Sequence, residues 1–138
     1  MLNVPPTYGI YPWWPQDGEG WIHPADVERA RMLIPGGRIL RRDRCVGRYL
    51  VLTYGELSIR VRPTLWHIVP TDGFDVGDLV EIRSRLGKNW PGIGVIGEMR
   101  WNRYRRRIDY FVRRRGMTLP SPYTAEDLRA IENWRGTG

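Results

Sequence analysis

Cysteine, lysine and phenylalanine are scarce in this 138-residue sequence. Cys45 is the only cysteine, so an intrachain disulfide is impossible, and we expect a reducing, cytoplasmic environment. No stretch approaches the roughly 20 apolar residues of a membrane-spanning helix. The N-terminus has neither the basic start nor the apolar run of a secretory signal. These absences predict a protein that makes no contact with a membrane.

Recognisable catalytic and metal-binding motifs are also missing. The sequence has no G-x-S-x-G, H-E-x-x-H, P-loop or dinucleotide fingerprint. Gly92, Gly94 and Gly97 have the G-x-G-x-x-G spacing, but they lie between predicted strands and no helix follows them. Two distant histidines, His23 and His67, make no metal signature. We expect no catalytic residue, metal or cofactor, and an enzyme is the weakest of three functional hypotheses.

Aromatic and turn-forming residues are plentiful instead. Seven Trp and seven Tyr supply a core whose aromatic side chains mostly carry a polar atom. Eleven Pro and sixteen Gly predict many turns and short strands. The expected fold class is mainly β, with one N-terminal helix, a short C-terminal helical turn and one or two sheets related to each other.

The first third of the chain divides into an aromatic arm and a helix. Residues 1–22 are predicted to be irregular, because Pro12 and Pro15 bar a central strand. This arm either wraps over the core or is an exposed peptide that inserts into a partner. A helix is predicted from Pro24, with apolar residues on one face, to its end at residues 35–37. His23 is placed to cap it.

The strongest local pattern is a hairpin over residues 49–62. Gly55-Glu56 fits a two-residue turn, and the alternation pairs Tyr54 with Leu57, Leu52 with Ile59, and Leu50 with Val61. Further strands are predicted at 38–42, 65–69, 79–85, 94–101, 107–113 and 116–119. Thr124 and Asp127 form a weak capping box for a final helical turn. The predicted divisions are 1–36 (arm and helix), 37–70 (first sheet), 71–133 (barrel) and 134–138 (tail).

A set of short phrases in the second half resembles a known fold. They are Phe74-x-Val76-Gly77-Asp78-x-Val80, Gly94-x-Ile96-x-Glu98-x-x-Trp101, Tyr110-x-Val112 and Tyr123-x-x-x-Asp127-Leu128. Together, residues 74–131 resemble an SH3-like small barrel of the Tudor or KOW kind. The whole chain also resembles a small bacterial family of unassigned function. Trp21–Val27 faintly matches Tyr123–Leu128, which suggests a duplication of the sheet.

The resemblance implies two different ligands. Tudor-type domains bind methylated cations in an aromatic cage, and the positions that match form a possible aromatic groove of Trp90, Trp101 and Tyr110. Neighbouring arginines would repel a cation, which argues against that ligand. KOW-type barrels bind RNA or ribosomal surfaces, which agrees better with the positive charge.

The positive charge is concentrated in one stretch. Of the 22 basic residues 21 are Arg, and eight lie between Arg100 and Arg115 beside a single acid, Asp109. This stretch carries +7, equal to the net charge of the chain, and such local charge attracts anions. Genomic bias toward arginine is an alternative cause of the composition.

Three interpretations of this stretch stay open. It contacts RNA or a ribonucleoprotein, it binds an acidic protein partner, or it is a solvated edge whose charges prevent pairing between sheets. A separate hypothesis is a peptide-binding module that uses the arm or the groove near Trp90. The residues predicted to bind nucleic acid are Arg100, Arg103, Tyr104, Arg105, Arg106, Arg107, Arg113, Arg114 and Arg115.

Overall fold

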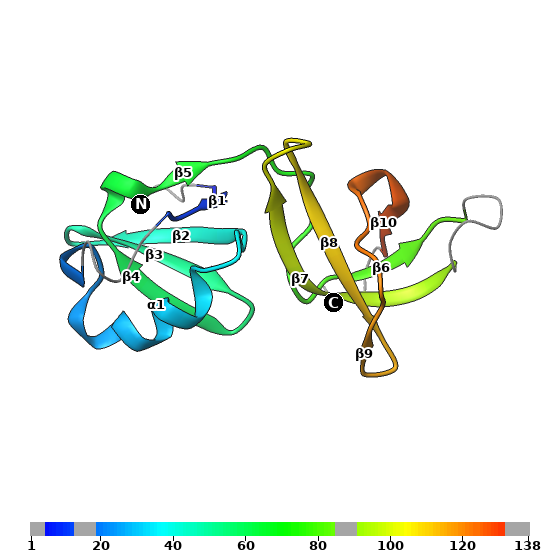
Figure 1. Ribbon diagram of the computed structural model, residues 1–138, viewed down its shortest axis with the longest axis horizontal. Helices are drawn as coiled ribbons and strands as arrows, with labels where there is room; N and C mark the ends of the chain where they lie inside the picture. The colour runs from blue at the N-terminus through cyan, green and yellow to red at the C-terminus, as the bar shows by residue number, and fades with distance from the viewer. Residues whose placement is uncertain (1–4, 13–18, 85–90, 132–138) are drawn as a thin grey trace. The chain divides into compact units, whose positions relative to one another are not determined.

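Two antiparallel sheets make up most of the protein. The structure, a computed structural model, describes residues 5–12, 19–84 and 91–131 (Figure 1). Each of two units, Met1–Thr71 and Asp72–Gly138, contains one five-stranded sheet. The prediction of a mainly β protein is confirmed. The only α-helix in the described ranges is α1, Val27–Leu33.

Unit 1 is built around the predicted hairpin. Its strand order is β4-β3-β2-β1-β5. The predicted register is confirmed, because Tyr54 pairs with Leu57, Leu52 with Ile59 and Leu50 with Val61. The elements of unit 1 are β1 (Thr7–Ile10), η1 (Glu19–Trp21), η2 (Pro24–Asp26), α1 (Val27–Leu33), β2 (Leu40–Val46), β3 (Tyr49–Tyr54), β4 (Leu57–Val61), η3 (Pro63–Leu65) and β5 (His67–Ile68).

The predicted helix begins with the 3-10 turn η2 and continues as α1. His23 caps it, because its Nδ1 accepts a hydrogen bond from the N–H of Ala25 at 3.0 Å. Ala30, Leu33 and Ile34 lie on one face and are buried in the core of unit 1. Burial of this apolar face stabilises a helix that is too short to form alone.

The prediction that residues 1–22 are irregular is wrong at Thr7–Ile10. These residues form β1, an interior strand in which Gly9 pairs with both Leu40 and Ile68. The prolines bar a strand only beyond Ile10, where the chain turns inward. There the Tyr11 side chain is 2% exposed and its hydroxyl donates to the carbonyl of Arg62 at 2.8 Å. Trp13 and Trp14 lie outside the described residues.

Unit 2 has the strand order β10-β6-β7-β8-β9. Four strands and the final helical turn agree with the prediction, and β10 was not predicted. The capping box is present, with Thr124 and Asp127 bonded in both directions. The elements of unit 2 are β6 (Leu79–Ile82), β7 (Gly92–Asn102), β8 (Arg107–Arg114), β9 (Met117–Thr118), η4 (Ala125–Asp127) and β10 (Leu128–Ala130).

The two sheets share one topology. In each, four consecutive strands form a meander, a 3-10 turn follows, and a last strand returns to pair antiparallel with the first. Both second strands contain one extra residue, Asp43 in β2 and Gly97 in β7, where the register shifts against the third strand. The element equivalent to η4 is η3. The faint match of Trp21–Val27 to Tyr123–Leu128 therefore compares segments that are not equivalent.

The hairpin after the bulge is where the units differ. In unit 1 it has three residue pairs and ends in the two-residue turn Gly47-Arg48. In unit 2 it has five pairs, ends at the pair Asn102 with Arg107, and closes through the four residues 103–106. Unit 2 therefore carries an extended hairpin, whose end we call the tip (Arg103–Arg106).

Candidate nucleic-acid interface

The tip is held in one conformation by two side chains at its base. Asn102 Oδ1 accepts hydrogen bonds from the N–H groups of Tyr104 and Arg105, each at 3.1 Å. Asp109 accepts from Asn102 Nδ2 at 3.1 Å and from Arg107 Nε at 3.3 Å. Such local bonds from Asn to following N–H groups order a turn. The tip is thus a fixed turn on a long hairpin.

Tyr104 presents an open aromatic ring at the tip. Its side chain is 84% exposed, and the Arg103 guanidinium lies 5.1 Å from the ring centroid. Arg103 Nη2 also donates to the Tyr104 hydroxyl at 3.1 Å. This hydrogen bond and the positive charge lower the pKa of the Tyr104 hydroxyl from its usual value. The pair is an exposed cation and ring on which a planar ligand can stack.

Arg105 and Arg106 carry uncompensated charge. Both are exposed, and within the described ranges neither has a carboxylate oxygen within 4.0 Å. Arg106 also has a left-handed backbone, with a φ of 52°. That conformation is unusual for a residue other than Gly or Asn, so this side chain is displayed at some cost to the stability of the turn.

The middle of the hairpin is neutralised by the protein itself. Arg100 Nε lies 3.0 Å from a carboxylate oxygen of Glu98, and its guanidinium lies 6.0 Å from the centre of the Phe111 ring. Arg107 pairs with Asp109 at 3.3 Å. Glu98 lies just outside the stretch over which the sequence charge is concentrated, so its effect on Arg100 was missed.

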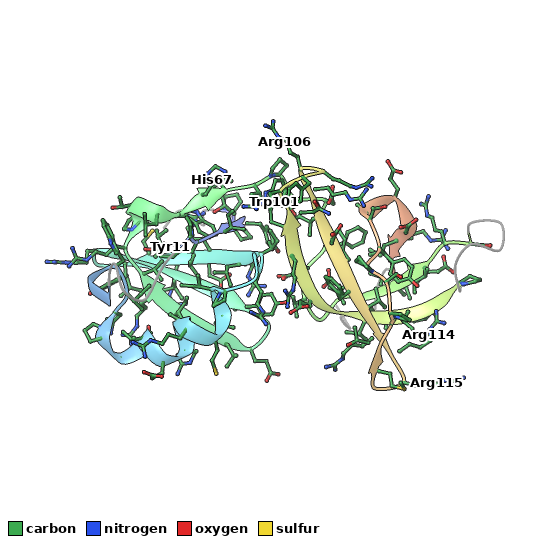
Figure 2. All side chains as sticks on the ribbon, in the orientation of Figure 1. Tyr11, His67, Trp101, Arg106, Arg114 and Arg115 are labelled. Carbon is green, nitrogen blue, oxygen red and sulfur yellow. The ribbon has the colours of Figure 1, made fainter. Side chains whose placement is uncertain are left out.

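The other arginines lie at the far end of β8. Arg113 extends along Gly97, and Arg114 Nε donates to the carbonyl of Ile93 at 3.3 Å. Arg115 occupies the β8–β9 turn with a φ of 53°. Figure 2 shows Arg106 at one end of the hairpin and Arg114 and Arg115 at the other. Eight strand residues separate these ends by roughly 25 Å, so the predicted residues form two basic clusters.

The predicted aromatic groove is not assembled as a whole. Tyr110 is 0% exposed, its ring packs edge-on against Phe74 at 5.4 Å, and it is a core residue. Trp101 is half-buried and pairs with Ile108 on the core side of the hairpin. Trp90 lies outside the described residues. Buried Tyr110 leaves no open ring face for a cage.

A cavity opens beside the tip. It has a volume of about 570 Å³ and is lined by Arg105 and Arg107 on one side and by Asp72 and the η4 segment on another. The Tyr110 hydroxyl donates to Asp72 Oδ2 at 2.8 Å. Sequence reasoning missed Asp72, because the bond that places it joins residues far apart in the chain.

Other chemistry has little support in the described ranges. They contain no group of three or more His, Cys, Asp or Glu side chains placed to hold a metal ion. Gly92, Gly94 and Gly97 lie within β7, where Gly94 and Gly97 face Val112 and Arg113 closely. No helix in the described part of the chain is long and apolar enough to span a membrane.

Fold and site together define a β protein of two topologically equivalent units, one with a basic hairpin tip. The chain belongs to a family of unknown function (DUF6960), whose family model matches residues 1–129. This finding agrees with the resemblance of the whole chain to a family of unassigned function. No curated protein and no solved structure matches the chain. The resemblance of residues 74–131 to an SH3-like barrel stays a prediction.

Proposed function

We propose that this protein is a non-catalytic binding module whose tip, Arg103–Arg106, contacts single-stranded RNA or a ribonucleoprotein surface. The observation that carries the proposal is the exposed Tyr104 ring, flanked by arginines on a turn that Asn102 holds in place. Unpaired bases stack on aromatic rings, and guanidinium groups hold phosphates. The base and the phosphate of a nucleotide therefore each meet a matching group at the tip.

The fold supports the same proposal. A meander of four strands, a 3-10 turn and a returning fifth strand is the arrangement expected of an SH3-like barrel in residues 74–131. Because of this strand order, the proposal includes an SH3-like barrel over residues 74–131. Such a barrel would act as a rigid base from which the extended hairpin reaches a partner.

The tip and the neutralised middle of the hairpin have different parts in this proposal. Arg105 and Arg106 have no carboxylate partner in the described ranges, whereas Arg100 and Arg107 are paired with acids of the same hairpin. A charge that is already paired gains less from a phosphate, because the existing pair must open first. The tip rather than the whole hairpin is therefore the proposed contact.

The test compares two double substitutions of equal charge. Arg105→Ser with Arg106→Ser removes two arginines from the tip, and Arg44→Ser with Arg48→Ser removes two exposed arginines from the equivalent hairpin of unit 1. Binding of a labelled mixed-sequence single-stranded RNA is measured by fluorescence anisotropy between roughly 50 and 200 mM salt. The tip variant should bind at least about tenfold more weakly, and its salt slope should be shallower by roughly 1.4.

The unit 1 variant is expected to keep most of the affinity. Equal losses in both variants would mean that only net charge matters and that no contact site exists at the tip. Absence of RNA binding by the unsubstituted protein at low salt would overturn the proposal. An acidic protein partner would then be the better interpretation of the tip.

A further inference from the structure

The cavity beside the tip has walls of opposite charge. Arg105 and Arg107 supply the cationic lining, while Asp72 and Glu126 supply the acidic lining, and the Asp127 carboxylate is bonded to Thr124. Pro122 adds apolar surface to the lining, whereas Ile108 is 2% exposed and adds little. A volume of about 570 Å³ lies within the range of small-molecule sites and has room for one nucleoside. A ligand that suits the cavity is thus flat, partly apolar and able to meet both charges.

Asp72 places an exposed carboxylate beside this space, and a hydrogen bond from the core of unit 2 positions it. Its Oδ2 accepts the hydrogen bond from the Tyr110 hydroxyl at 2.8 Å. Tyr110 is itself wholly buried and its ring packs against Phe74, so the donor belongs to the core of unit 2. In the described ranges Asp72 makes no ion pair with Arg105 or Arg107 within 4.0 Å, although all three line the cavity. An ionised carboxylate accepts about four hydrogen bonds, so Asp72 retains acceptor sites for a ligand.

The chemistry of a fixed carboxylate selects among the four bases. Guanine alone presents two adjacent N–H donors, at N1 and N2, on its Watson–Crick edge. Adenine, cytosine and uracil each place an acceptor beside their donor, and that acceptor would face the negative oxygens. Sequence-specific RNA recognition reads this edge in splayed, unpaired bases. Two parallel donors also match the fork of a carboxylate.

We infer that this cavity holds a guanine base of single-stranded RNA, with Asp72 as its specificity-determining residue. In this arrangement Asp72 accepts from N1–H and N2–H, Arg105 contacts an adjoining phosphate, and Tyr104 at the tip stacks on a neighbouring base. The inference rests on the proposed function, because it assigns a base preference to the same site. It adds that binding depends on sequence as well as on charge.

The test uses labelled oligouridine with one central substitution and the unaltered protein. We compare a central guanosine, an adenosine and an inosine, which keeps N1–H but lacks the N2 amine. Guanosine should bind about tenfold more tightly than adenosine, with inosine between them. Asp72→Asn should abolish the difference between guanosine and adenosine, since an amide presents one acceptor and one donor. Glu56→Gln, at an exposed turn of unit 1, should preserve it.

The outcomes separate this inference from the proposed function. If the three oligonucleotides bind equally while the Arg105 and Arg106 substitutions still weaken binding, the guanine site is wrong and the tip contact stands. If none of them binds at low salt, both are wrong. The inosine comparison uses the unaltered protein. It therefore still tests the guanine site if Asp72→Asn fails to fold.

Discussion

The two units use one strand plan for two surfaces. Each has a four-strand meander, a bulge of one residue in the second strand, a 3-10 turn and a returning strand. After the bulge, unit 1 closes at once through Gly47-Arg48, whereas unit 2 extends over residues 101–108. Within the described part of unit 2, three exposed arginines of this extension have no carboxylate oxygen within 4.0 Å: Arg103, Arg105 and Arg106. Under the proposed function, the shared frame supplies stability and the extension supplies the partner surface.

The frames also differ in how they fill one cross-strand pair. Gly9 on the first strand of unit 1 pairs with Leu40, and the equivalent pair in unit 2 is Val80 with Gly94. In unit 1 the glycine is on the first strand, and in unit 2 it is on the second. Each pair still consists of one glycine and one branched residue. At both glycines an added Cβ would lie less than 3.0 Å from a neighbouring atom. The close atoms belong to other neighbours, the His67 carbonyl oxygen at Gly9 and Val112 Cγ1 at Gly94, so each unit requires a glycine at this pair because of a different contact.

The largest effect is expected from Gly9→Ala. The new Cβ would lie 2.2 Å from the carbonyl oxygen of His67 in β5, and backbone cannot move aside as a side chain can. We expect unit 1 to lose at least about 3 kcal/mol of its free energy of unfolding. Unit 2 should keep its stability, as followed by denaturant unfolding with NMR amide signals from each unit.

Two control substitutions sharpen that result. Gly20→Ala meets nothing within 4 Å and should have little effect. Gly97→Ala at the bulge of unit 2 would place its Cβ 2.9 Å from Arg113 Cγ, so that side chain must shift. Its effect should lie between those of Gly20→Ala and Gly9→Ala, because the three nearest atoms include no backbone. A stable Gly9→Ala protein with an intact unit 1 would show that β1 is not an interior strand.

A smaller effect is expected from Asp26→Asn in unit 1. The buried Asp26 carboxylate accepts from the Arg60 N–H and Nε, both at 2.8 Å, and lies 3.7 Å from Arg29. Loss of these charge-assisted bonds should cost about 2 kcal/mol at neutral pH. Thermal or urea unfolding of unit 1 measures the loss.

The pH dependence gives this prediction a second readout. The Arg60 hydrogen bonds hold the pKa of Asp26 below its usual value, despite the opposing effect of burial. A lowered pKa in the folded state stabilises the protein above the unfolded pKa, about 3.9, and this contribution disappears as the pH falls through the folded pKa. The stability gap between the protein and Asp26→Asn should therefore narrow below about pH 4. A gap that stays constant under acid would contradict this role of the ion pair.

The fold was predictable from sequence where local chemistry fixes it. Alternation and a Gly-containing turn specified the register of β3 and β4, and the Thr124–Asp127 box specified η4. Strands β1 and β10 were missed, because each is four residues or fewer and is paired only with residues distant in the chain. Short strands of this kind acquire their conformation from the sheet that they join.

The site was predictable to a smaller extent. The arginine-rich stretch identified the tip, since charge is visible in composition. Its division into a free tip, a neutralised middle and a far cluster depends on strand length and on cross-strand neighbours such as Glu98. The placement of Asp72 depends on a bond to Tyr110 that no local pattern reveals.

The most direct test replaces one arginine in the turn at each end of strand β8. Arg106→Asn and Arg115→Asn remove the same charge from exposed turns with almost identical φ angles, 52° and 53°. Asn adopts the left-handed backbone more readily, so each variant should gain about 0.5 kcal/mol of stability. Single-stranded RNA affinity at low salt should fall about threefold to tenfold in Arg106→Asn and hardly change in Arg115→Asn. Equal losses in the two variants, or a larger loss in Arg115→Asn, would contradict the assignment of the contact to the tip.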